Sequence, residues 1–321
     1  MKKVNWGVLG TANIAKEQTI PGMLLANNAT LYGIAGRDLE KAKWFQEAFG
    51  FEKAYDSYEA LLEDENIEAV YIPLPNHLHK EWIIKAARKK KHILCEKPMV
   101  PTPEDAREIM KVCKEEGVLL MEAYAYLHSD ITKAVVEEMK QQTLGDIKLI
   151  EAVFFIPEVD PQNIRMKRDY FGGATYDVGC YNISLVLRLL SQMPEKVEAM
   201  GHFTDAGVDD YSSIFMEFPN KTFVSTACGM CAVGRGDRYF IYGTKGMLEA
   251  NIPYNAQGTL SYKIHKGDEV KEITMEVPNN YQLEVEQFGR CILEGEAPFV
   301  ENEFSLQVVE VMKAALDKIG Y

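Results

Sequence analysis

Short apolar runs and amphipathic stretches alternate along the first 122 residues of the chain. The apolar runs have the length of buried strands, and the stretches between them repeat their apolar residues with the period of a helix. Strands are predicted at 4–10, 30–35, 68–72, 92–95 and 118–122, and helices from residue 39, near 78–89 and near 103–116. This alternation predicts an α/β domain, residues 1–122, whose parallel sheet is wound on both faces.

The pattern changes after residue 122. A helix is predicted around Ile131, Val135 and Met139, and most of the remaining chain alternates apolar and polar residues in the way of strands. Strands are predicted at 147–156, 196–204, 211–218, 221–229, 238–242, 247–251, 258–264 and 270–277, and helices near 175–190, 281–294 and 303–319. Turns such as Pro219-Asn220 are typical of hairpins. We therefore predict a second, α+β domain, residues 123–321, with a large and mainly antiparallel sheet.

The turn after the first strand has the character of a phosphate-binding loop. It is formed by Gly10, Thr11, Ala12, Asn13 and Ile14. The dinucleotide pattern G-x-G-x-x-G/A falls on Gly10, Ala12 and Ala15, with alanine in place of the second glycine. Small residues still allow the backbone to approach a pyrophosphate at the positive end of a helix. A plain tight turn would need no ligand, but the next strand favours a Rossmann-like dinucleotide-binding domain.

That next strand ends at Gly36-Arg37-Asp38. NAD enzymes commonly place an acidic residue here for the ribose 2′-hydroxyl, whereas an arginine suits the 2′-phosphate of NADP. Arg37 therefore favours NADP, with NAD possible. Asp38 is expected to cap the adjoining helix.

The strand at 92–95 ends in Glu96, Lys97 and Pro98, an unusual place for charged residues. In open α/β sheets, ligands bind beyond the carboxyl ends of the strands. Glu96 and Lys97 are therefore expected to point into a ligand crevice, although an isolated pair of this kind is more often a solvated turn.

Composition and charge narrow the class of protein. The chain of 321 residues is 47% hydrophobic, enough for two cores, and its net charge of −13 without a long basic block argues against nucleic acid. No apolar run approaches the roughly 20 residues of a membrane span. The N-terminus lacks a signal pattern, and the six scattered cysteines are expected to be reduced, so a cytoplasmic protein is predicted.

No metal site is predicted. Cys228 and Cys231 form a C-x-x-C pair, but they lie in a strand-like run, where residues three apart face opposite sides of the sheet. Among the histidines only His77 and His79 are close together, and no second ligand cluster accompanies them.

A last motif opens the helix predicted from residue 175. It reads Gly172-Gly173, then Asp177 and Tyr181, and residues four apart share one face of a helix. With residues 4–15 and Glu96-Lys97-Pro98, this stretch resembles the Gfo/Idh/MocA oxidoreductases over nearly the whole chain. The chain is most similar to the branch of dimeric dihydrodiol dehydrogenases and NADP-dependent xylose dehydrogenases, in which tyrosine replaces the histidine of inositol dehydrogenases. Residues 119–123, 207–210 and 243–246 also resemble that branch.

The resemblance implies an NADP-dependent dehydrogenase that moves a hydride between nicotinamide and a carbon bearing a hydroxyl or carbonyl on a sugar, polyol or diol. Tyr181 would exchange the proton, Lys97 would lower the pKa of Tyr181 and bind the nicotinamide ribose, and Asp177 would orient the substrate or Lys97. It also implies a cis bond before Pro98 and further contacts to the cofactor from Pro75, Asn76, His79 and Glu96. The broad predicted sheet of the second domain suggests a face for a homodimer or higher homo-oligomer.

Several alternatives stay open at this point. The segment 124–128 departs from the tryptophan and arginine pattern of dihydrodiol-type relatives, where it helps to shape the substrate pocket, so the identity of the substrate stays open. Within the same class, a dihydrodiol or dicarbonyl reductase competes with a sugar dehydrogenase. A catalytically silent dinucleotide-binding sensor is the alternative from another class. Tyr181 alone could be a packed aromatic residue, and His79 could cap or pack against its helix.

Overall fold

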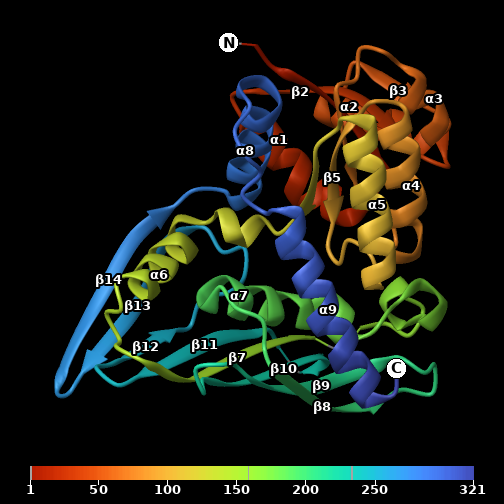
Figure 1. Cartoon of the computed structure of the whole chain (residues 1–321). Helices are drawn as coiled ribbons and strands as arrows, with labels where there is room; N and C mark the ends of the chain where they lie inside the picture. The colour runs from red at the N-terminus through yellow and green to blue at the C-terminus, as the bar shows by residue number, and fades with distance from the viewer. Residues whose placement is uncertain (1, 158, 233) are drawn as a thin grey trace. The chain divides into compact units, whose positions relative to one another are not determined.

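The computed structural model describes residues 2–157, 159–232 and 234–321, and it divides into two compact units (Figure 1). The first contains the residues up to His128 together with Asn279–Ser305, and the second contains Ser129–Pro278 and Leu306–Tyr321. The predicted domain boundary after residue 122 stays a prediction. The compact units differ in their bounds from the predicted domains, because Asn279–Ser305 packs with the first unit.

The first unit is built on a six-stranded parallel sheet in the order β3-β2-β1-β4-β5-β6. The strands are β1 (Val4–Leu9), β2 (Ala29–Ala35), β3 (Lys53–Tyr55), β4 (Ala69–Ile72), β5 (His92–Glu96) and β6 (Leu120–Ala123). The strand order reverses between β1 and β4, and the crevice beside such a reversal is where doubly wound sheets bind nucleotides. The predicted Rossmann-like sheet is confirmed.

Helices surround this sheet. They are the π-helical turn η1 (Ala15–Thr19), α1 (Ile20–Leu25), α2 (Leu39–Phe49), α3 (Tyr58–Glu63), α4 (Asn76–Arg88), α5 (Pro103–Glu116), the 3-10 turn η2 (Ala125–His128) and α8 (Asn280–Glu294). Asp38, Ser57 and Thr102 accept backbone hydrogen bonds as N-caps, so the predicted cap at Asp38 is confirmed. Helix α8 packs closely on α1. The absence of a side chain at Gly22 allows this approach, because a Cβ there would lie only 2.7 Å from the Cβ of Tyr281.

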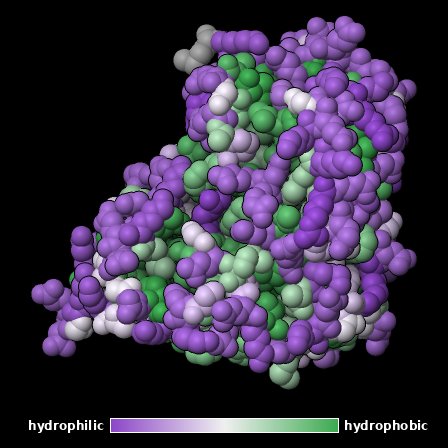
Figure 2. Space-filling model, viewed as in Figure 1, coloured by the Kyte–Doolittle hydropathy of each residue, from purple (hydrophilic) through white to green (hydrophobic). Residues whose placement is uncertain are grey.

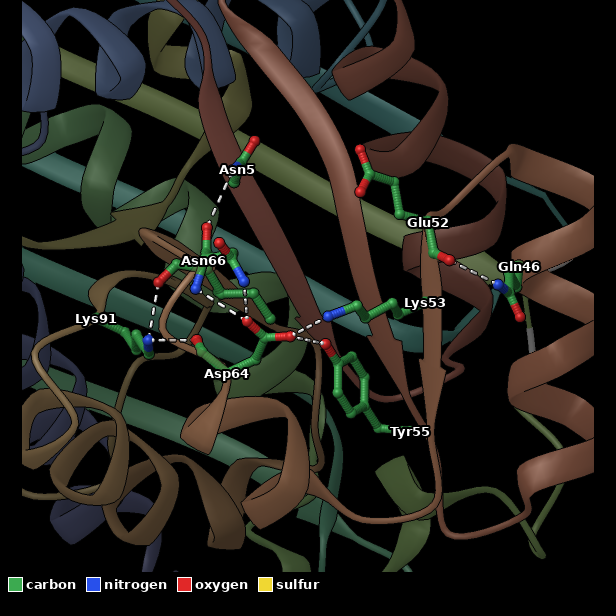
Figure 3. Close-up of polar contacts among 9 residues, drawn as sticks. Asn5, Gln46, Glu52, Lys53, Tyr55, Asp64, Asn66 and Lys91 are labelled. Carbon is green, nitrogen blue, oxygen red and sulfur yellow. Dashed lines mark hydrogen bonds and ion pairs between the residues drawn. The ribbon is translucent and has the colours of Figure 1, made fainter.

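A polar cluster holds strand β3, which the sequence pattern did not predict (Figure 3). The Asp64 carboxylate accepts hydrogen bonds from Lys53 Nζ and Tyr55 Oη, both at 2.7 Å. These bonds lower the pKa of Asp64, that from Lys53 most of all. Lys91 Nζ donates to the carbonyl oxygens of Asp64 and Ile67 at 2.8 and 2.9 Å. The cluster therefore anchors the short edge strand and the loop before β4, and its role is structural.

The second unit is built on an eight-stranded sheet in the order β14-β13-β12-β11-β7-β10-β9-β8. The strands are β7 (Ile147–Pro157), β8 (Lys196–Phe203), β9 (Asp209–Glu217), β10 (Phe223–Ala232), β11 (Gly236–Gly243), β12 (Met247–Ala250), β13 (Gly258–Lys266) and β14 (Glu269–Val277). Within this sheet, as far as the structure describes it, β10 and β7 pair in parallel and the other neighbouring strands pair antiparallel. The predicted, mainly antiparallel sheet is confirmed.

The helical segments of this unit are α6 (Asp130–Lys140), the 3-10 turns η3 (Ile164–Met166) and η4 (Arg168–Tyr170), the π-helical turn η5 (Thr175–Gly179), α7 (Cys180–Leu190) and most of α9 (Asn302–Ile319). Helix α7 and turn η5 pack on strands β7 and β10 (Figure 1). Residues on the covered face of β9 and β10, such as Ile214 and Val224, are buried.

The other face of β8, β9 and β10 carries exposed apolar side chains. They are Met200, Tyr211, Phe215 and Phe223. On β10, Cys228 is buried and Cys231 is exposed, which agrees with their predicted placement on opposite faces.

Hydrophilic side chains cover most of the face of the molecule seen in Figure 2. Among the helices of the described residues, none is long and apolar enough to cross a membrane.

Candidate active site

The turn after β1 is shaped by a glycine. Gly10 has a φ of +127°, which side chains with a Cβ rarely adopt, and an added Cβ would lie 3.1 Å from Leu74 Cδ2. Its N–H donates to the Ala35 carbonyl at 2.9 Å, so the turn is fixed to the end of β2. Thr11, Ala12 and Ile14 are half-buried and Asn13 is exposed. The turn therefore requires glycine at position 10, and its contact with a phosphate group stays a prediction.

The helix after this turn differs from the prediction. An α-helix is predicted from the motif, whereas residues Ala15–Thr19 form the π-helical turn η1 and the regular helix α1 begins only at Ile20. Such turns occur frequently at functional sites. The hydrophobic pattern does not distinguish them, because a turn of five residues is too short to show a period.

Positive side chains gather at the ends of β1 and β2. Arg37 is exposed. Burial raises the pKa of Tyr58, and the positive charge of Arg37 lowers it again, so the two side chains are close. Lys41, on α2, donates from Nζ to the Thr11 carbonyl at 2.8 Å. The sequence analysis missed Lys41, which lies outside the dinucleotide pattern and reads as an ordinary exposed helix residue. Together the glycine turn, Arg37 and Lys41 suit a dinucleotide with a 2′-phosphate.

Lys97 comes directly after β5, where it is half-buried, and the predicted cis bond to Pro98 is confirmed. Beside it, Glu96 accepts a hydrogen bond from Tyr71 Oη at 2.5 Å, and that oxygen accepts one from Thr19 Oγ1 at 2.9 Å. Thr19 is the last residue of η1. A buried chain of hydrogen bonds thus links the helix after the phosphate turn to the end of β5.

Pro75, Asn76 and His79 lie where β4 turns into α4. Pro75 is the N-cap, Asn76 is the first helical residue, and His79 is fully buried. The His79 ring nitrogens lie 2.7 Å from the Leu74 carbonyl oxygen and 3.0 Å from that of Pro98. Packing therefore accounts for the contacts of His79, which joins the loop after β4 to the loop after Lys97. Direct contact of these three residues with a cofactor stays a prediction.

Two buried carboxyl groups of the first unit interact electrostatically with the charged residues at the end of β5. Glu122, at the end of β6, is 1% exposed and accepts a hydrogen bond from the Met99 amide at 2.8 Å. Burial raises its pKa from 4.5 to about 7; the charge of Glu96 raises it further, and that of Lys97 opposes the rise. Burial also raises the pKa of Glu284 on α8, with a smaller contribution from Glu96. The sequence analysis placed Glu122 at the end of a strand, in the family-like stretch 119–123, and gave it no chemical role.

The raised pKa of Glu122 makes stability depend on pH. The folded state holds this proton more tightly than the unfolded state, so ionisation destabilises the fold as pH rises from 4.5 towards 7. Glu122→Gln keeps the acceptor for Met99 and cannot ionise. The difference in unfolding free energy between Glu122→Gln and the wild type should therefore shift by roughly 3 kcal/mol in favour of the variant when the pH rises from 5 to 8. Urea unfolding at the two pH values measures this shift.

The control for this prediction is Glu115→Gln, which changes an exposed glutamate on α5. Its difference from the wild type should be the same at both pH values. A pH-independent difference for Glu122→Gln would show that Glu122 is ionised across this range.

Close contacts with neighbouring atoms require glycine at positions 172 and 173. A Cβ on Gly172 would overlap the Arg165 carbonyl, and a Cβ on Gly173, whose φ is +111°, would overlap the Asp209 carboxylate. That carboxylate, which is buried, accepts hydrogen bonds from the Thr175 amide and hydroxyl, both at 2.7 Å. The glycines therefore allow Asp209 to hold the start of η5.

Asp177 lies in the π-helical turn η5, where a continuous helix was predicted. Its carboxylate accepts a hydrogen bond from Arg165 Nε at 2.7 Å, and its side chain is 16% exposed. The ion pair with Arg165 therefore fixes the orientation of the Asp177 carboxylate.

Tyr181 lies in the first turn of α7 and is half-buried among aromatic rings. The ring centroids of Phe154 and Tyr254 are 5.3 and 5.0 Å from that of Tyr181. Its hydroxyl oxygen lies 3.5 Å from Asn255 Nδ2. A second arginine, Arg235, lies over the Phe154 ring and is ion-paired with the buried Asp237.

The predicted site residues thus fall into two groups. Gly10 to Ile14, Arg37, Glu96 and Lys97 lie at the carboxyl ends of the strands in the first unit, while Asp177 and Tyr181 lie on one helical segment of the second. Phe154, Tyr254 and Asn255 were missed, because they come from a strand and a loop that carry no motif.

Two family models match this chain. Residues 4–124 match the model described as oxidoreductase family, NAD-binding Rossmann fold, and residues 132–249 match the model described as GFO/IDH/MocA C-terminal domain. The chain belongs to the Gfo/Idh/MocA family of oxidoreductases. The resemblance found in the sequence is confirmed, as is the prediction of an oxidoreductase that uses a nicotinamide cofactor.

Individual relatives cover almost the whole chain. It is 33% identical over 313 residues to a D-xylose 1-dehydrogenase (NADP(+)) of Haloferax volcanii, with 96% of this chain and 95% of the relative covered. It is 28% identical to a trans-1,2-dihydrobenzene-1,2-diol dehydrogenase of Xenopus laevis, with 98% of both chains covered.

Among solved structures, a 3-ketoreductase from Actinomadura kijaniata in complex with NADP and TDP-benzene is similar, with a TM-score of 0.93 and 29% identity over 99% of this chain and 98% of that one. A tyrosine-to-phenylalanine variant and a lysine-to-alanine variant of that ketoreductase have been solved with the same two ligands.

Proposed function

We propose that the protein is an NADP-dependent oxidoreductase acting on a CH–OH group of a sugar or another small polyol, whose bound nicotinamide gives or takes the hydride. The observation that carries this proposal is the set of Lys97 after β5 and Asp177 with Tyr181 on one helical segment. The relatives named for D-xylose and for a dihydrodiol support it.

In this proposal Tyr181 moves the proton. A free phenol has a pKa of about 10 and is a poor base at neutral pH, but a nearby ammonium favours the phenolate. We assign that ammonium to Lys97. Asp177, held by Arg165, would accept hydrogen bonds from substrate hydroxyls.

Charge around Tyr181 favours an uncharged substrate. Arg165 and Arg235 lie near the proposed site in the second unit, and each is ion-paired with an aspartate. Paired in this way, they offer less attraction to a phosphate or carboxylate than unpaired arginines would.

The cofactor would be held by Gly10 to Ile14, with Arg37 at the 2′-phosphate and Lys41 beside it. NADP in the name of the xylose dehydrogenase and in the ketoreductase structure supports this assignment. Pro75, Asn76, His79, Glu96 and Lys97 are proposed to complete the site from the loops after β4 and β5.

Arg37→Asp should reverse or flatten the preference for NADPH over NADH. Replacement of a cation at the 2′-phosphate by an anion removes charge-assisted hydrogen bonds, so the affinity for NADPH should fall by about 10- to 100-fold. Fluorescence titration of both cofactors measures this. Lys43→Asp, which changes an exposed lysine on α2, should leave both affinities unchanged. Equal affinities in the wild type would contradict the assignment of Arg37.

A substrate screen tests the proposed function. The purified protein is assayed with NADP(+) on aldoses, polyols and trans-diols, and with NADPH on dicarbonyls, by the absorbance of NADPH. Turnover of an aldose or polyol supports the proposal, and turnover of only diols or dicarbonyls supports the dihydrodiol or dicarbonyl reductase. Binding of NADPH without turnover of any compound would favour the sensor.

We further propose a homodimer or higher homo-oligomer that buries the open face of β8, β9 and β10. Met200, which is 75% exposed, lies there with Tyr211, Phe215 and Phe223, and soluble monomers rarely expose such a group of apolar side chains. The scattered positions of the six cysteines, which favour the reduced state, support the reducing cytoplasm as the compartment.

A further inference from the structure

Asn255 lies beside the hydroxyl of Tyr181 in an unusual backbone conformation. Its φ is +61°, and a hydrogen bond of 3.0 Å from the Ala256 amide to the Pro253 carbonyl closes a tight turn around Tyr254 and Asn255. Asparagine and glycine are the residues that tolerate this backbone region best. The turn therefore explains why one of these two residues stands at position 255.

The turn does not explain the side chain. Asn255 Nδ2 lies 3.5 Å from the Tyr181 oxygen, a long contact that leaves room to tighten when a substrate is present. Asn255 Oδ1 is buried and has no hydrogen-bond partner among the residues that the structure describes. A buried acceptor without a partner destabilises a protein, and glycine would form the same turn without that cost.

The neighbours of Asn255 fix it in this orientation. The Tyr254 amide donates to Asp237 Oδ2 at 2.8 Å, and the Tyr254 hydroxyl donates to Asn182 Oδ1 at 3.0 Å. Asn182 in turn donates to the Ala227 carbonyl on β10 at 3.0 Å. The loop that carries Asn255 is thus held against the sheet and against α7, the helix that carries Tyr181.

We propose that Asn255 is a substrate-binding residue that recognises the hydroxyl next to the reacting carbon. Its nitrogen holds the Tyr181 hydroxyl, and its carbonyl oxygen accepts a hydrogen bond from the substrate. The two ends of one amide are adjacent, so a donor on Oδ1 lies next to the substrate oxygen that Tyr181 contacts. Two adjacent hydroxyl groups, or a carbonyl with an adjacent hydroxyl, have this arrangement.

This inference rests on the proposed role of Tyr181, and its consequence is selectivity. A compound that lacks the second hydroxyl leaves Oδ1 without a partner in the complex, so it should react about 10- to 100-fold less efficiently. The preference should depend on Asn255 and on no feature of the cofactor site.

The test uses the full-length protein with NADP(+) and three pairs of compounds that differ by one hydroxyl. They are D-xylose and 2-deoxy-D-xylose, D-glucose and 2-deoxy-D-glucose, and trans-cyclohexane-1,2-diol and cyclohexanol. The quantity measured is the ratio of kcat/KM within each pair. Asn255→Gly, which suits a positive φ and removes both ends of the amide, should bring the ratio of the preferred pair close to one.

A second variant separates the two ends of the amide. Asn255→Asp keeps an acceptor for the substrate and replaces the N–H donor at Tyr181 by a carboxylate oxygen. It should retain the ratio, while the pH at which the rate rises should increase, because a carboxylate beside the phenol disfavours the phenolate. A purely structural role for Asn255 would not produce this combination.

Asn251→Gly is the matched control, since Asn251 is an exposed residue of the same loop. It should change neither the ratio nor the pH profile. The inference is overturned if an active Asn255→Gly enzyme keeps the wild-type ratio, or if the wild type accepts both members of every pair equally. The proposed function fails separately if the wild type turns over none of these compounds and none in the wider screen.

Discussion

Tyr181→Phe should lower kcat by about 10² to 10⁴ on the best substrate of the screen. Positioned general acid-base groups contribute a factor of this size, which corresponds to roughly 3 to 5 kcal/mol of activation free energy. The phenyl ring keeps its contacts with Phe154 and Tyr254 and loses only the oxygen next to Asn255. Thermal stability and NADPH affinity should therefore hardly change, and steady-state kinetics with a thermal melt and a cofactor titration measures all three quantities.

Tyr176→Phe is the matched control. Tyr176 is a buried tyrosine of η5, and its ring packs against Phe171 and Tyr321. Loss of its hydroxyl should leave the turnover nearly unchanged. Full activity of Tyr181→Phe would instead mean that another group donates the proton.

Lys97→Met should reduce turnover at least as much as Tyr181→Phe, and it should also weaken NADPH binding. Methionine keeps an unbranched chain of similar length and removes the ammonium, which is proposed both to favour the phenolate and to bind the nicotinamide ribose. Lys89→Met, at the exposed end of α4, should affect neither quantity. Unchanged NADPH affinity in Lys97→Met would contradict the role of Lys97 at the ribose.

The double variant of Lys97 and Tyr181 tests whether the two residues act as one unit. Groups that depend on each other give losses that are not additive. The combined loss in kcat should therefore be smaller than the product of the two single losses. Strictly multiplicative losses would show that Lys97 and Tyr181 act independently.

Most of the fold was predictable, because its strands are long enough to carry a pattern. All eight predicted strands of the second unit are present, and β13 pairs with β14 from Gly258↔Val277 to Lys266↔Glu269. Strand β3 was missed because Lys53–Tyr55 is too short for a period, and polar contacts to Asp64 hold it in place. Helix α8 was predicted as a helix, but its packing on α1 depends on contacts that no local pattern contains.

The candidate site was predictable where its chemistry lies in a motif. Gly10, Lys97, Asp177 and Tyr181 belong to stretches whose residue types and spacing are specific. Lys41 and Asn255 do not, and Glu122 lies in such a stretch without an evident chemical role, because the importance of all three comes from neighbours distant in sequence. The π-helical turns η1 and η5 were also unpredictable, although each coincides with a predicted functional segment.

The different burial of the cysteines has a practical consequence for thiol chemistry. Burial raises the pKa of the Cys113 and Cys228 thiols to about 12 and that of Cys291 to about 11, and a thiol reacts as its thiolate. Cys231 is the exposed one of the six. A maleimide dye should therefore react first at Cys231, once per chain, and burial of this face of β10 in the proposed oligomer should slow that reaction without any engineered cysteine.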